Sequence, residues 1–173
     1  MRVPSTAPTG APMNNLTNPP RNAIGDRAGP RYSLKTFKLS VRACEPGAKV
    51  DSPKAAVPVL RQILAQLDAD QEHFILLALS TQLHVTGYKV VSSGRMASTL
   101  VDSRILFRSA LLLGAASILL AHNHPSGVAT PSAEDRALTR RLVACGDMLD
   151  LRVLDHLILG RDVYSFAERG ELR

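Results

Sequence analysis

Apolar and polar residues follow two regular periods along this chain, one typical of strands and one typical of helices. Between residues 32 and 41 apolar side chains alternate with basic ones, which predicts a half-buried strand. Unbroken apolar runs instead predict strands that are buried on both faces. The predicted strands are 32–41, Phe74–Leu79 with a hairpin partner over 83–91, Ser117–Ala121, and one or two closing strands over 151–159, before a short terminal element over 164–168.

Three helices are predicted from capping residues followed by apolar positions at helical spacing. Ser52 and Pro53 open the first, because serine caps a helix and proline is favoured in its first turn. The predicted helices follow Ser52, Asp102 and Ser132, and extend to the apolar position Leu67, to about Leu113 and to near Gly146. Strands that alternate with helices but include a hairpin predict an α/β domain with a mixed sheet.

The first thirty residues have a different composition from the rest of the chain. They hold six of the eleven prolines, mixed with Asn, Thr, Ser and Gly, and show no hydrophobic period. Such a segment cannot bury enough apolar surface to offset its ordering entropy. We therefore predict a disordered tail over 1–30, an N-terminal strand and linker over 31–50, and the α/β domain over 51–173. An incorrectly assigned start codon would give the same composition at 1–30.

Composition and charge narrow the class of protein. The chain is 45% hydrophobic and 21% charged, which is typical of globular domains, and it has no apolar run near the ~18 residues of a membrane span. Two distant cysteines predict neither disulfides nor a cysteine zinc site, so we expect a cytoplasmic protein without a membrane partner. A net charge of +6 is compatible with DNA contact, but the basic residues are dispersed and support it weakly.

The candidate chemistry lies between His122 and Asp135. Two histidines at positions i and i+2 project to the same face of a strand, so both imidazoles can approach one ion. Asp135 falls in the first turn of the next predicted helix, and two histidines with one carboxylate form a typical catalytic zinc site. Structural alternatives remain: Ser132 and Asp135 also match a helix-capping box, and paired histidines occur at sheet rims.

These residues resemble a known family. His-x-His, seven residues and Ser-x-x-Asp match the JAMM motif of the JAB/MPN+ metalloprotease superfamily, and HNHPSG, PSAED and DHLILG are similar to the bacterial RadC family over Ser52–Glu168. The resemblance implies a curved mixed β-sheet flanked by helices, the JAB/MPN, cytidine-deaminase-like architecture. It also implies that His122, His124 and Asp135 bind Zn²⁺.

The same resemblance implies two further roles. Ser132 would hydrogen-bond the substrate oxyanion or its surroundings, and Glu72 would be the general base that accepts a proton from the zinc-bound water. Without the downstream motif, the sequence favours Glu72 as a surface residue beside Asp70 and Gln71, and the complete motif reverses this preference. We expect His73 and His84 to be structural or exposed, and Asn123 to make a structural hydrogen bond. Asp155 and His156 recur in the RadC pattern, and we expect them to support the ligands from behind or to pack, rather than to bind the metal.

Two functions are consistent with these residues and motifs. The first is a zinc metallohydrolase that cleaves a peptide or isopeptide bond in an unidentified peptide or protein. The alternative is a non-enzymatic DNA repair or recombination accessory with a structural metal, whose basic surface contacts phosphates. The segment before Arg31 does not resemble the helix-hairpin-helix region of longer RadC proteins, which puts DNA association in doubt.

Deletion of residues 1–30 should leave the unfolding midpoint unchanged, because their composition cannot contribute to a core. Thermal unfolding of the full and shortened chains measures the difference. A midpoint lowered by several degrees would show that the tail packs on the domain.

Overall fold

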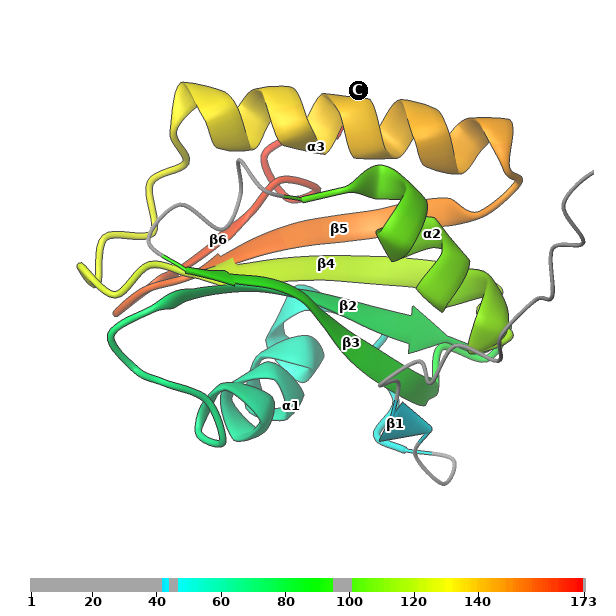
Figure 1. The fold of residues 1–173 in the computed structure, drawn as a ribbon, viewed down its shortest axis with the longest axis horizontal. Helices are drawn as coiled ribbons and strands as arrows, with labels where there is room; N and C mark the ends of the chain where they lie inside the picture. Colours follow the sequence, from blue (N-terminus) through cyan, green and yellow to red (C-terminus); the bar gives the residue numbers. More distant parts are fainter. Residues whose placement is uncertain (1–41, 44–46, 95–100, 173) are drawn as a thin grey trace, which may run out of the picture. The chain divides into compact units, whose positions relative to one another are not determined.

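The computed structural model describes residues 42–43, 47–94 and 101–172. In these residues one mixed sheet has helices on both of its faces (Figure 1). The described strands are β1 (Arg42–Ala43), β2 (Glu72–Leu79), β3 (Val85–Gly94), β4 (Ser117–Asn123), β5 (Arg152–Leu159) and β6 (Val163–Ser165). The described helices are α1 (Pro53–Leu64), α2 (Ser103–Leu112) and α3 (Ala133–Met148). The strands are ordered β1-β3-β2-β4-β5-β6.

The pairing of the strands makes the sheet mixed. β4 and β5 run parallel, whereas the other neighbouring strands of the described sheet are antiparallel. The parallel pair needs a crossover, and α3 supplies it on the same side of the sheet as α2, while α1 covers the opposite side (Figure 1). The predicted α/β fold with a mixed sheet flanked by helices is confirmed.

The core divides into two layers because successive side chains on a strand point to opposite faces. On β2, Phe74 and Leu76 pack with α2 and α3, whereas Ile75 and Leu77 pack with α1. β4 follows the same rule, so its even-numbered residues face α3. This alternation determines which polar side chains at the strand ends share a face. No helix in the described ranges is both long and apolar enough to cross a membrane.

Several predicted boundaries shift by a few residues. β3 begins at Val85 rather than 83, because Leu83 has φ 64° in the turn, where its N–H donates to the carbonyl of Ser80. α1 ends at Leu64, and Leu67 packs on the core from the following turn. The closing segment 151–159 is a single strand, and the terminal element is β6. The tail over 1–30 and the strand predicted over 32–41 lie outside the described residues.

The third helix ends close to its predicted end near Gly146. α3 continues to Met148, and Gly146 lies buried inside it. A Cβ on Gly146 would lie 2.6 Å from the carbonyl oxygen of Leu151, whose N–H donates to the carbonyl of Gly146 at 2.9 Å. The glycine is therefore needed for close packing of the chain as it returns into β5, and not for helix termination.

Gly146→Ala tests this packing by the sign of its effect. In an open helix the change would stabilise by about 0.5–1 kcal/mol, because alanine has the higher helix propensity. Here we expect destabilisation of roughly 1–3 kcal/mol from overpacking against Leu151. Urea unfolding of both proteins measures the difference, and a stabilised variant would contradict the packing argument.

Candidate metal centre

Two histidines lie side by side at the end of β4. Phe74 pairs with His122 across β2 and β4, and their rings stack with centroids 5.9 Å apart. His122 is buried and His124 partly exposed, and the rings tilt toward one another with centroids at 4.9 Å. The predicted common face for these two histidines is therefore confirmed.

The loop after β4 fixes the ring of His124. Gly127 has φ 80°, a conformation that favours glycine, and its carbonyl accepts from the N–H of Arg161 at 2.8 Å. This contact ties the loop to the turn between β5 and β6. The next carbonyl along the loop, that of Val128, lies 2.7 Å from Nδ1 of His124. Because a carbonyl only accepts, Nδ1 carries a proton, and in the neutral ring Nε2 keeps a lone pair.

Asp135 reaches the site from the first turn of α3. Ser132 caps this helix: its Oγ accepts from the N–H of Asp135 at 3.1 Å, and Oδ2 of Asp135 accepts from the N–H of Ser132 at 2.8 Å. The capping box that the sequence pattern allows is therefore present. It holds the buried carboxylate in a fixed orientation, with Oδ1 turned toward His122.

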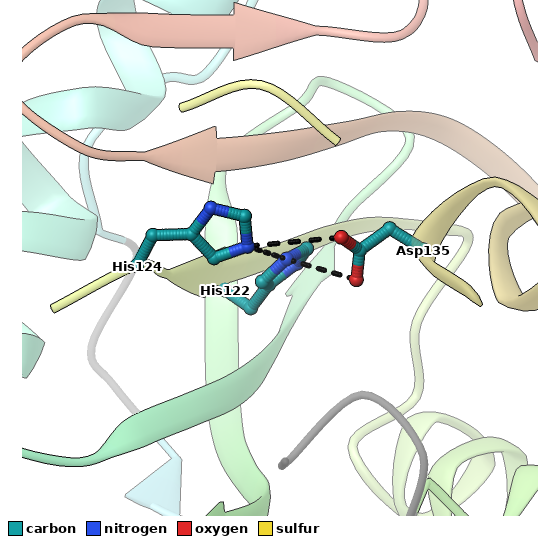
Figure 2. A group of neighbouring side chains, drawn as sticks. All are labelled: His122, His124 and Asp135. Carbon is teal, nitrogen blue, oxygen red and sulfur yellow. Dashed lines mark hydrogen bonds and ion pairs between the residues drawn. The ribbon is translucent and has the colours of Figure 1, made fainter. Parts of the chain in front are cut away.

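The ligand atoms of these three residues converge on one point (Figure 2). Nε2 of His122 lies 3.1 Å from Nε2 of His124 and 3.2 Å from Oδ1 of Asp135, and Nε2 of His124 lies 3.7 Å from Oδ2. One candidate atom from each residue falls within 4.8 Å of the others. His122, His124 and Asp135 could therefore hold a metal ion.

An unsatisfied atom supports this interpretation. Oδ1 of Asp135 is buried and accepts no hydrogen bond from the described part of the chain. A buried acceptor without a partner costs roughly 1–3 kcal/mol, and a cation at this point would remove that cost. The donor set of two imidazoles and one carboxylate also matches sites for divalent transition metals. The residues present fit a metal ion.

The charges of the site favour ligation. Burial raises the pKa of Asp135, but the neighbouring rings of His122 and His124 outweigh burial and leave the pKa of this carboxyl well below its ordinary value. Asp135 is therefore ionised. The Asp135 carboxylate, whose Oδ2 lies 3.7 Å from Nε2 of His124, raises the pKa of His124 more than burial lowers it, and the charge of Glu72 adds a smaller contribution in the same direction.

Glu72, the predicted base, occupies the first position of β2. It lies on the same face as Phe74, and Phe74 pairs with His122, so Glu72 is on the face that carries the histidines. Its side chain is half-buried. The structure therefore brings Glu72 to the end of the sheet where the metal ligands lie, and its base role stays a prediction.

Ser132, the predicted oxyanion partner, directs its hydroxyl elsewhere. Its Oγ lies 2.6 Å from Oδ2 of Asp135, which only accepts, so the hydroxyl donates to the carboxylate. The proton that would stabilise an oxyanion is engaged with the ligand in this conformation. The arrangement shows Ser132 orienting Asp135, and the oxyanion role stays a prediction.

Other polar residues have the structural roles expected from the sequence. Asn123 accepts from the N–H of His73 at 2.8 Å and donates to the carbonyl of Gln71, so it joins β4 to β2. His73 and His84 bond to nearby loop or strand groups away from the ligands. His156 is buried against His122, with their ring nitrogens 2.9 Å apart, which agrees with the predicted role in support or packing.

Comparison with known proteins shows similarity to one family, the RadC-like JAB domains. The profile of the RadC-like JAB domain matches residues 50–171. The chain is 44% identical over 143 residues to UPF0758 protein STH371 of Symbiobacterium thermophilum, a match that covers 80% of this chain and 60% of that protein. It is 42% identical over 129 residues to UPF0758 protein YfjY of Escherichia coli, covering 74% of this chain and 79% of that protein.

A third relative, a UPF0758 protein of Rubrobacter xylanophilus, is 43% identical over 136 residues, and the match covers 78% of this chain. The matched part spans only 59% of that relative's length, as it spans 60% of the Symbiobacterium protein.

Metal affinity should rise with pH through the pKa of His124, because a proton and a metal ion compete for its Nε2. That pKa is raised above 6.5 in the metal-free site, so affinity should still be increasing at pH 6.5 and should level off above the raised pKa. Competition with a coloured chelator across this range measures the curve. An affinity that does not vary with pH would exclude His124 as a ligand.

Proposed function

The chain belongs to the family of RadC-like JAB domains, and we propose that it is a zinc-dependent hydrolase that cleaves a peptide or isopeptide bond. The observation that carries this proposal is the convergence of one ligand atom each from His122, His124 and Asp135, where the buried Oδ1 of Asp135 accepts no hydrogen bond from the described residues. A structural metal would be expected to have four protein ligands, whereas the described residues supply three. A fourth position is then available for water or substrate.

Zinc is the proposed metal because two imidazoles and one carboxylate are ligands typical of catalytic zinc sites. When bound, zinc lowers the pKa of a coordinated water to near neutrality and polarises a substrate carbonyl. His122, His124 and Asp135 would hold it through Nε2, Nε2 and Oδ1.

Glu72 would move the proton. Its carboxylate accepts a proton from the attacking water at one oxygen and returns it to the nitrogen of the leaving amine. Two facts support this role: Glu72 lies on the face and at the strand end of the ligands, and its charge contributes to the raised pKa of His124.

Ser132 would act first on Asp135 and only then on substrate. Its hydroxyl donates to Oδ2 and so fixes the carboxylate. A rotation of the hydroxyl would release its proton toward an oxyanion, while the N–H of Ser132 would still hold Oδ2. The proposed oxyanion role therefore requires this rotation during the reaction.

The alternative function, a DNA repair or recombination accessory, has less support from the described residues. It would use the basic face of α3, but Arg136 pairs with Glu171 and Arg141 donates to the carbonyl of Val101. Arginines engaged in this way are less available for phosphates. We therefore favour the hydrolase, with an unidentified peptide or protein as substrate.

Glu72→Gln should keep one zinc ion per chain and lose hydrolysis, because glutamine preserves shape but cannot accept a proton. The loss should be roughly 10²–10⁴-fold, the usual contribution of a general base. Elemental analysis measures the zinc, and cleavage of a library of quenched fluorescent peptides and isopeptide-linked peptides measures activity.

Two variants serve as controls for this experiment. Glu134→Gln makes the same chemical change at an exposed residue of the first turn of α3 and should retain both zinc and activity. His124→Ala should lose the metal. Loss of zinc from Glu72→Gln would identify Glu72 as a ligand, and full activity would exclude it as the base. In a zinc-loaded crystal structure, its carboxylate should lie within hydrogen-bond distance of the water nearest the zinc.

A further inference from the structure

Three polar side chains form a continuous row behind the candidate metal ligands. Nδ1 of His122 lies 2.9 Å from Nε2 of His156, and Nδ1 of His156 lies 2.6 Å from Oγ1 of Thr139. The row ends where Oγ1 of Thr139 lies 2.6 Å from the backbone carbonyl oxygen of Asp135. All three side chains are almost completely buried, with exposures of 1%, 0% and 1%.

The direction of these hydrogen bonds follows from the Thr139 end. A carbonyl oxygen only accepts, so a contact of 2.6 Å between it and Oγ1 requires the hydroxyl hydrogen of Thr139 to lie between them. That hydroxyl has no second hydrogen. Its oxygen therefore accepts from His156, and Nδ1 of His156 carries a proton.

The environment of His156 determines its other nitrogen. The ring stacks on Phe166 with centroids 5.1 Å apart and lies 5.2 Å from the ring of Phe74. Apolar surroundings of this kind favour an uncharged imidazole. With its one proton on Nδ1, His156 presents a lone pair at Nε2, and that lone pair accepts from Nδ1 of His122.

His122 is thereby left with a lone pair on Nε2, the atom that faces His124 and Asp135 (Figure 2). The reverse direction would place a proton on this Nε2 and block ligation. In the neutral ring of His124, Nε2 likewise keeps its lone pair, because Nδ1 donates to the carbonyl of Val128. The row ends on the backbone carbonyl of Asp135, the third candidate ligand. It therefore connects His122 on β4 with Asp135 on α3 through His156 on β5.

We propose that Thr139 and His156 are positioning residues that hold His122 as its Nδ1–H tautomer and so keep the Nε2 lone pair directed at the metal. The inference rests on the metal site of the proposed function and does not depend on hydrolysis. Partners of this kind orient metal-ligating histidines, and their loss typically weakens metal affinity roughly 10- to 100-fold.

Thr139→Val tests the first member of the row, since valine has nearly the shape of threonine without the hydroxyl. Nδ1 of His156 would then lack an acceptor, so the proton of His156 should move to Nε2 and the row should reverse. We expect zinc affinity, measured by chelator competition, to fall roughly 10- to 100-fold. Thr139→Ser restores the hydroxyl and should restore the affinity.

Ser109→Ala is the matched control for a lost helix hydroxyl. Ser109 is buried in α2, and its Oγ donates to the carbonyl of Ile105 four residues earlier, as Thr139 does to Asp135. The control should lose a similar stability in urea unfolding and leave zinc affinity unchanged. Equal zinc affinity in wild type and Thr139→Val would overturn the proposal.

The tautomer itself is visible in long-range ¹H–¹⁵N spectra of the metal-free full chain labelled at histidine. His122 should be the Nδ1–H tautomer in wild type and Thr139→Ser, and the Nε2–H tautomer in Thr139→Val. An Nε2–H tautomer in wild type would overturn the positioning role whatever the activity. Zinc binding with the expected order of affinities but without hydrolysis would support the positioning role and count against the proposed function.

Discussion

Burial of His122 and Asp135 is the constraint on which the construction of the candidate metal site depends. His122 and Asp135 are buried, so each of their polar atoms needs a partner within the protein or adds an energetic cost. Nδ1 of His122 has His156, Nδ1 of His124 has a loop carbonyl, and Oδ2 of Asp135 has the helix cap. The atoms that remain all face one point, so the network that satisfies the outer atoms also defines the metal site.

The sheet topology supplies these partners from separate elements. Parallel pairing of β4 and β5 places His156 beside β4, and a register shift between Ile118 and Leu119 changes which β5 residues share a face. Asp155 consequently lies opposite Leu119 and accepts from Ser165 and the N–H of Ala167, which joins β5 to the segment after it. The adjacent residues Asp155 and His156 on β5 thus lie on different faces of the sheet. Asp155 joins β5 to the following segment, and His156 contacts the candidate ligand His122.

The candidate ligands can be identified from the sequence because their arrangement is local. The two-residue period of a strand places His122 and His124 together, and a capping box fixes Asp135 three residues after Ser132. The fold class follows from the same periodicities.

The partners behind the ligands cannot be predicted in this way, because they depend on tertiary structure. His156 meets His122 across 34 residues and Thr139 across 17, through strand register and helix docking. Gly146 is a similar case: its residue type suggests a helix end, whereas the return of the chain at Leu151 determines its role.

The capping interpretation and the metal interpretation of Ser132 and Asp135 are compatible, because a carboxylate has two oxygens. Oδ2 accepts from the backbone and hydroxyl of Ser132, and Oδ1 remains for a cation. The cap also helps to keep the carboxylate ionised, since a helix N-terminus favours negative charge and the bond from Ser132 lowers the pKa of Asp135. The local interaction that begins α3 therefore prepares the third ligand in charge and orientation.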